Sequence, residues 1–394
     1  MALLASACAW AWCAHLLWGT IVPGNLHLPH VDARRFFSAS LLRRTSSFDR
    51  FLDIAGVLGS LAEVVVLGVY ACYGHRLMKE SAAGRIGTGI MLALLGFALV
   101  WLSQAPFDVA ALWWERRYHV IHEGYVAGLI GSFLGLGASF IWIALAVAVA
   151  MALAGWMRRR WWIAAAPVFA ALALLSAFVS PYLIAKTHAL GNPVLTAEAR
   201  TLEAREGING TPVLVRNRSR TTSEVNAETT GIGPSQRVVL WSTLLDGHFS
   251  RAETGVVMAH EFGHVARAHV LKQIGWIALF LIPATALVAL ATRRRGGLAR
   301  PEAVPVALFV FVVLGLVTVP LFTLVTRRYE TEADWSELRA THEPAATRRV
   351  FERLASTNLS DPDPPAWAYV LYARTPTLAQ RIAMTEAWEE RASR

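Results

Sequence analysis

The stretch Met-Ala-His-Glu-Phe-Gly-His-Val-Ala-Arg-Ala-His occupies residues 258–269. In an α-helix, positions i and i+4 lie on one face, so His260 and His264 can bind the same metal ion. Glu261 between them is then placed to act as general base on a water molecule that the metal activates. A surface helix that carries two histidines by chance is the alternative. We favour a metal centre, because a third candidate ligand follows later in the chain.

The rest of the chain has the composition of a membrane protein. It is 55% hydrophobic and only 16% charged, with a mean hydropathy of +0.42, whereas soluble domains carry about 25% charged residues. The net charge of +9 comes mostly from arginine, which favours a bacterial source. We assign this charge to loops that flank membrane helices and expect no nucleic-acid partner, because no basic patch is interleaved with aromatic residues.

Seven apolar stretches are long enough to cross about 30 Å of hydrocarbon. Two crossings separate the polar segment 187–272 from the polar segment 327–394, so both must lie on the same side of the membrane. Arginine-rich loops occur on both sides and give no orientation. We expect a mainly α, polytopic and monomeric protein of a bacterial cell membrane, with its catalytic side in the cytoplasm. The seven stretches are residues 3–22, 54–74, 88–105, 124–155, 161–184, 274–292 and 303–325.

The spans and the polar segments divide the chain into four parts. Residues 1–186 form an N-terminal five-helix region, and residues 273–326 form two further membrane helices. The catalytic domain is split between residues 187–272, with the cleft strands and the metal-binding helix, and residues 327–394, with the third ligand and C-terminal helices.

The first polar segment has a mixed local pattern. Short β-like runs occur at 212–216 and 237–241, and a turn-rich run occupies 229–234. Thr196 is a candidate N-cap of an Ala-rich helix, and the metal-binding helix is expected to begin near Arg251.

Glu330 and Asp334 follow the seventh span, on the same side as the histidine pair. A catalytic zinc needs three protein ligands and an open position. Glu330, at the head of a helix, is the candidate third ligand, and Asp334 can accept a proton from a ligand imidazole. A solvated, charged helix start is the alternative. His269 lies about 180° round the helix from His260, so we do not expect it to bind the same metal.

These motifs together resemble the type I CAAX prenyl proteases, membrane zinc metalloproteases related to the bacterial protease HtpX. The run 219–227 resembles the family's Ser-Lys-Arg…Asn-Ala segment, and the run 237–245 is similar to Arg-Ile-Val-Leu-x-Asp-Thr-Leu. The metal-binding pentad, two spans and Glu330-x-x-x-Asp334 follow in the family's order. His269 matches a histidine that often follows the family's pentad.

The resemblance implies seven transmembrane helices around an intramembrane chamber, with a small α+β zincin-type domain facing it. It implies one Zn²⁺ per chain, with Glu261 as the general base. The implied zinc ligands are His260, His264 and Glu330.

The resemblance also implies a substrate cleft beside the metal. A substrate backbone could add to the edge of the Asn-Ala strand as an extra strand. Arg381 matches the family, and it could brace the site or only pair with an acidic helix. The implied cleft residues are Asn226, Ala227, Glu228 and Arg381.

One departure from the family lies in the run 374–381. The family commonly has Ser-His-Pro-x-Leu-x-x-Arg there, and Thr375 replaces its histidine. Loss of one donor to the developing oxyanion typically costs about 10²–10³ in rate. Arg374, Tyr372 or Arg381 could compensate.

The sequence therefore predicts an integral-membrane zinc endopeptidase acting on membrane-associated or flexible polypeptides. The resemblance offers prenylated C-terminal peptides as substrates, whereas a bacterial source favours turnover of membrane or tail peptides. One alternative is a proteolytically silent zinc-binding membrane protein with a sensor or binding role, which Thr375 supports. Another is a transporter-like bundle with a structural zinc, which the lack of a fourth candidate ligand disfavours.

Overall fold

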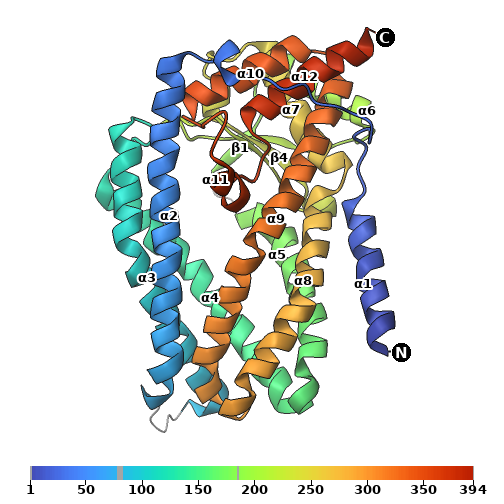
Figure 1. Cartoon of the computed structure of the whole chain (residues 1–394). Helices are drawn as coiled ribbons and strands as arrows, with labels where there is room; N and C mark the ends of the chain where they lie inside the picture. Colours follow the sequence, from blue (N-terminus) through green and yellow to red (C-terminus); the bar gives the residue numbers. More distant parts are fainter. Residues whose placement is uncertain (1, 78–82, 184–185, 394) are drawn as a thin grey trace.

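The computed structural model describes residues 2–77, 83–183 and 186–393. Long helices form a bundle, and a small sheet with shorter helices lies at one end of it (Figure 1). The chain is mainly helical, as expected. The long helices are α1 (Ala2–Trp18), α2 (Ala39–Tyr73), α3 (Gly84–Arg117), α4 (Tyr125–Met157), α5 (Trp161–Leu183), α8 (His269–Thr292) and α9 (Val304–Thr341).

Most of each apolar stretch in the sequence lies in one of these seven helices. Length and hydropathy identify five candidate membrane spans among the described residues. The part of α4 from Phe140 onward falls together with α5 in one of these candidates, and α1 has 17 residues. The chain is an integral membrane protein, and seven crossings remain a prediction. The candidate spans are Ala39–Arg76, Gly84–Arg117, Phe140–Leu183, His269–Arg295 and Pro301–Thr341.

A four-stranded sheet lies at the polar end of the described chain, with strand order β1-β2-β4-β3. Strands β2 and β4 pair in parallel, whereas the other pairs are antiparallel. The β-like runs at 212–216 and 237–241 are confirmed as strands. Strand β3 extends into residues 229 and 230, which the sequence assigned to a turn, and it forms an edge of the sheet. The strands are β1 (Thr187–Ala189), β2 (Val213–Arg216), β3 (Ala227–Thr230) and β4 (Arg237–Trp241).

Five shorter helices surround the sheet at this end of the bundle (Figure 1). The N-cap of the first is Asn192, whose Oδ1 accepts hydrogen bonds from the amides of Val194 and Leu195. The expected cap at Thr196 is wrong, because Pro193 at the first helical position already suits the start of the helix one turn earlier. The helices are α6 (Pro193–Glu206), α7 (Arg251–Ala266), α10 (Pro344–Thr357), α11 (Ala366–Leu371) and α12 (Leu378–Ala392).

Helix α7 begins at Arg251, as the sequence predicts, and a capping box fixes its start. Ser250 Oγ accepts from the amide of Glu253, and Glu253 Oε2 accepts from the amide of Ser250. The Glu253 side chain is buried, and its Oε1 also pairs with Arg349 and Arg353 of α10. The capping box thereby joins the metal-binding helix to the C-terminal helices.

Helix α9 runs without a break from the apolar bundle into the polar end (Figure 1). The expectation that Glu330 stands at the head of a helix is therefore wrong. The run that follows the seventh span contains no Pro or Gly, so nothing in it ends a helix. Residues 329 and 332–338 are buried by the surrounding elements, so this part of α9 is not a solvated helix start.

We expect Glu253→Gln to destabilise the protein in a pH-dependent way. Burial alone would raise the pKa of Glu253, but hydrogen bonds from Ser250 and Arg353 outweigh it and lower the pKa below 4.5. A carboxyl with a lowered folded-state pKa contributes stability above its unfolded-state pKa, and the contribution is lost as the pH falls through the folded-state pKa. Thermal unfolding of both proteins in detergent, from about pH 7 to about pH 3, measures this difference. A difference in unfolding temperature that stays constant at low pH would contradict the assignment.

Candidate active site

The structure brings His260 and His264 of α7 together with Glu330 of α9. His260 Nε2 lies 3.1 Å from His264 Nε2 and 3.3 Å from Glu330 Oε2, and His264 Nε2 lies 3.6 Å from Glu330 Oε1. Donor atoms that bind a tetrahedral ion at about 2.1 Å are about 3.4 Å apart. The three residues therefore fit one zinc ion. Among the described residues this group has three members, as in a catalytic rather than a structural zinc site.

A close contact between α7 and α9 sets these distances. Gly263, in the turn between the two histidines, packs against α9. A Cβ atom at this position would lie 3.1 Å from Ser336 Cβ and 3.3 Å from the Ala333 carbonyl oxygen. A larger side chain would push the two helices apart and separate the ligands.

Asp334 and Arg381 extend the site behind His260. Asp334 Oδ1 lies 2.9 Å from His260 Nδ1. Arg381 of α12 holds the same carboxylate through two hydrogen bonds, from Nη2 at 2.5 Å and from Nε at 2.9 Å. Of the two roles that the sequence left open for Arg381, the geometry favours bracing the site. His260 then presents Nε2 to the metal position.

The site favours positive charge. Burial lowers the pKa of His260, but hydrogen bonds and charge from Asp334 and Glu330 outweigh burial and raise it to about 10. The pKa of Arg381 is also raised, because Asp334 and Glu330 outweigh its burial. Carboxylates that hold a proton on a buried imidazole so strongly also suit a metal cation, which would replace that proton.

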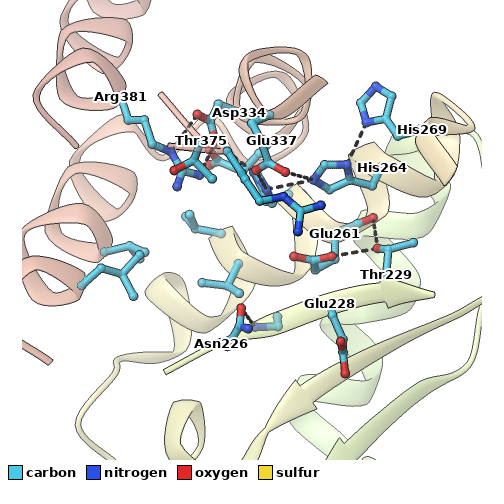
Figure 2. Close-up of a pocket in the computed structure, with 18 of the residues that line it drawn as sticks. Asn226, Glu228, Thr229, Glu261, His264, His269, Asp334, Glu337, Thr375 and Arg381 are labelled. Carbon is cyan, nitrogen blue, oxygen red and sulfur yellow. Dashed lines mark hydrogen bonds and ion pairs between the residues drawn. The ribbon is translucent and has the colours of Figure 1, made fainter. Parts of the chain in front are cut away.

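His269 lies beside His264 rather than on the opposite side of one helix. Helix α7 ends at Ala266, and Ala268 adopts a left-handed conformation with φ 52° before α8 begins at His269. The expectation of a continuous helix is therefore wrong. The ring of His269 lies with its Nδ1 2.8 Å from His264 Nδ1 (Figure 2). His269 thus contacts Nδ1 of His264, whereas Nε2 of His264 faces Glu330. His269 is not in the ligand group.

Glu261 is held by Thr229, a residue that the sequence did not single out. Thr229 Oγ1 lies 2.8 Å from Glu261 Oε2 and 2.9 Å from the Glu261 carbonyl oxygen (Figure 2). Thr229 was missed because the sequence places it in a turn. Its position two residues after Ala227 is the signal that could have found it, because alternate residues of a strand share one face.

A cleft of about 450 Å³ contains the ligand group and Glu261. Strand β3 and the residues before it form one wall, and α10 and the segment before α12 contribute others. Glu228 is one of the cleft residues that the sequence predicts, and its Oε1 lies 3.7 Å from Arg216 Nη1. Burial raises the pKa of Glu228, although the charge of Arg216 acts to lower it. The lining includes Asn226, Ala227, Glu228, Thr229, Val350, Phe351, Leu354, Arg374, Thr375 and Arg381.

The residues that could replace the missing family histidine are now distinguishable. Arg374 and Thr375 line the cleft. Arg381 is committed to Asp334. Tyr372 packs instead on α2, where a Cβ at Gly56 would lie 3.2 Å from its hydroxyl oxygen. Of the three residues that the sequence offered, the geometry therefore favours Arg374 as the donor beside the cleft.

We expect Arg381→Met to weaken zinc binding about 10- to 100-fold, because Asp334 would lose two hydrogen bonds that hold its carboxylate and would orient His260 less well. Competition with a chelator in detergent measures the affinity. Arg391→Met is the matched control, because Arg391 is an exposed residue of the same helix, 3.4 Å from Asn25. Equal zinc affinities of the two variants would contradict the bracing role.

The C-terminal half of the chain matches a known family. The model described as peptidase family M48 matches residues 190–389. An uncharacterised metalloprotease, YhfN of Bacillus subtilis, is 28% identical over 245 residues, which cover 59% of this chain and 57% of the relative. A CAAX prenyl protease 1 homolog of Dictyostelium discoideum is 26% identical over 205 residues, covering 48% of this chain and 47% of the relative. The chain thus spans about half the length of these curated relatives.

The fold extends the likeness over nearly the whole chain. The crystal structure of Ste24p from S. mikatae superposes with a TM-score of 0.78, covering 97% of each chain at 15% identity. At that identity the match shows the fold alone. Because the family model covers half of the chain and includes every residue of the candidate metal site, the chain belongs to peptidase family M48, the metalloprotease group that the sequence motifs predict.

Proposed function

We propose that this protein is a membrane-embedded zinc endopeptidase whose zinc is held by His260, His264 and Glu330. The observation that supports this most directly is the position of Glu261. Its carboxylate lies in the same cleft as the three-residue ligand group but is not a member of it. A carboxylate that is not itself a ligand, beside an open metal position, is the arrangement that peptide hydrolysis requires.

Bound zinc would supply Lewis-acid chemistry, polarising the peptide carbonyl and acidifying water. Glu261 accepts the proton of the attacking water and returns it to the leaving amine. Thr229 holds the Glu261 carboxylate in place through its hydroxyl. Arg374, at the cleft wall, stabilises the charge that develops on the carbonyl oxygen.

Strand β3 is proposed as the docking site for the substrate backbone. It is an edge strand, paired only with β4 in the described sheet, and it lines the cleft beside Glu261. An extended peptide can add to such an edge through main-chain hydrogen bonds, which do not depend on sequence. Asn226, Ala227 and Glu228 would contact the peptide there.

The substrate class follows from this backbone docking and from the membrane. Main-chain recognition requires an unfolded segment, so we propose flexible or membrane-associated polypeptides as substrates. The name of the Dictyostelium relative supports prenylated C-terminal peptides as one such class. We propose a monomer in a bacterial cell membrane, with the cleft on the cytoplasmic side.

The architecture that we propose has seven membrane crossings around a chamber. Residues 187–272 and 327–394 act as one catalytic domain, carried by the helices of residues 1–186 and 273–326. The support for this division is that α7 and α9, from the two halves, share the metal ligands. The polar segments also meet at one end of the bundle (Figure 1).

A proteolytically silent zinc-binding protein is the second candidate. Thr375 lines the cleft at the place where the family commonly has a histidine. A silent protein needs no general base, so the two candidates differ in what Glu261 does.

We expect Glu261→Gln to keep zinc and to lose about 10²–10⁴-fold in cleavage rate, because the amide cannot accept the proton. Zinc content and cleavage of an unstructured reporter peptide and a prenylated peptide measure both properties. Glu198→Gln is the control, because Glu198 of α6 pairs with Arg251 and does not line the cleft. Zinc in the wild type without cleavage of either peptide would favour the silent protein.

We expect Thr229→Val to reduce kcat about 10- to 100-fold with zinc content unchanged, because Glu261 loses a hydrogen bond to its charged oxygen. Thr229→Ser should restore most of the rate. Thr230→Val is the matched control, since neighbouring strand residues face opposite sides. A loss no larger than that of the control would remove Thr229 from the site.

A further inference from the structure

A second chain of polar side chains reaches the metal site from the side opposite Asp334. Its first link joins His264 Nδ1 to His269 Nδ1, 2.8 Å apart. Its second link joins His269 Nε2 to Glu332 Oε2, 3.1 Å apart. His269 and Glu332 are 1% exposed, so the second link is shielded from water, which would otherwise compete for this hydrogen bond.

The order of the protons in this chain follows from the chemistry of its two ends. A carboxylate only accepts hydrogen bonds, so His269 donates from Nε2 to Glu332. Neutral His269 then has a lone pair on Nδ1, which accepts from Nδ1–H of His264. His264 is left with its lone pair on Nε2, the atom that faces Glu330 and His260. The chain thus selects the tautomer of His264 that can bind a metal.

Both members of the chain are fixed by further contacts. Glu332 Oε1 accepts from the backbone amide of Ile21 at 3.0 Å, and its Oε2 lies 3.4 Å from Lys272 Nζ. The His269 ring stacks on Tyr329, with centroids 4.7 Å apart. Every group that contacts Glu332 in these bonds is a donor, which suits an ionised carboxylate.

The end of α1 contributes to the same anchoring. Tyr329 donates from its hydroxyl to the Leu17 carbonyl oxygen, and Arg328 donates to the Trp18 carbonyl oxygen. With the amide of Ile21, three backbone groups at the end of α1 and just beyond it bind the segment of α9 that carries Glu330. This part of α9 is therefore fixed on one side by the N-terminal segment and on the other by Arg381.

We propose that His269 and Glu332 are positioning residues of the metal site, which orient His264 through a proton-ordered hydrogen-bond chain anchored by the segment after α1. The proposal rests on the proposed function only in taking His264 as a zinc ligand. It gives His264 the support from a carboxylate that Asp334 gives His260, with His269 between the imidazole and the carboxylate.

The test measures zinc affinity rather than cleavage. His269→Phe keeps a ring against Tyr329 but removes both nitrogens. His269→Asn keeps an acceptor near the position of Nδ1. Glu332→Gln removes the charge at the far end of the chain. Each variant is purified as the full chain in detergent, and its zinc dissociation constant is measured by competition with a chelator. The visible spectrum of the Co²⁺-loaded protein reports the ligand geometry.

Two controls separate orientation from general stability. Glu203→Gln alters another buried carboxylate, whose Oε1 accepts from the amide of Thr211 away from the metal site. Trp276→Phe removes the hydrogen bond to the Tyr329 hydroxyl without touching His269. Thermal unfolding of all variants accompanies the zinc measurements.

We expect His269→Phe and Glu332→Gln to weaken zinc binding about 10- to 100-fold, with an altered Co²⁺ spectrum. His269→Asn should recover most of the affinity, and both controls should bind zinc as the wild type does. Wild-type affinity in His269→Phe or in Glu332→Gln would overturn the proposal, as would equal losses in the controls. If His269→Phe does not fold, Glu332→Gln still decides the outcome.

The outcomes also separate this proposal from the proposed function. Tight zinc binding by a wild type that cleaves no peptide would overturn the protease and leave the positioning residues intact. Cleavage by the wild type, together with normal zinc binding in His269→Phe, would overturn the positioning residues alone. A wild type that binds no zinc would overturn both.

Discussion

The contact between α7 and α9 at Gly263 is the constraint on which the site depends. Two ligands come from one helix and the third from the other, so the distance between the helices sets the distance between the ligands. Glycine permits the approach because a Cβ there would meet Ser336 and Ala333. Because α9 is one helix from the apolar bundle to the polar end, this contact also ties the metal site to the membrane-embedded part of the protein.

Charge balance explains why so many buried acids gather around this contact. An unpaired buried carboxylate is costly, and a bound cation offsets much of that cost. Asp334 pairs with Arg381, and Glu332 with Lys272. Glu330 faces the two histidines. The ligand group therefore suits a cation at its centre. The same carboxylates raise the pKa of His260, because they also stabilise a proton on its imidazole.

Sequence reasoning did well where a pattern is local. Apolar length predicted the long helices, β-like runs predicted β2 and β4, and the start of α7 was predicted near Arg251. It did less well where a neighbouring element decides the outcome. Thr229 was assigned to a turn, yet pairing with β4 extends β3 through it. His269 was placed on the wrong side of one long helix, because the left-handed turn at Ala268 carries no Gly or Pro signal.

The sequence by itself determined the family and the candidate ligands, because these depend on spacing and order along the chain. The features are a histidine pair at helical spacing and a later Glu-x-x-x-Asp. It also determined that the chain lies in a membrane, since apolar length and low charge require it. Only the tertiary structure decided which groups support these residues. Thr229, Glu332 and Arg381 lie 32, 63 and 47 residues from the partners they contact. No spacing rule links residues so far apart, because their contact depends on how separate helices and strands pack.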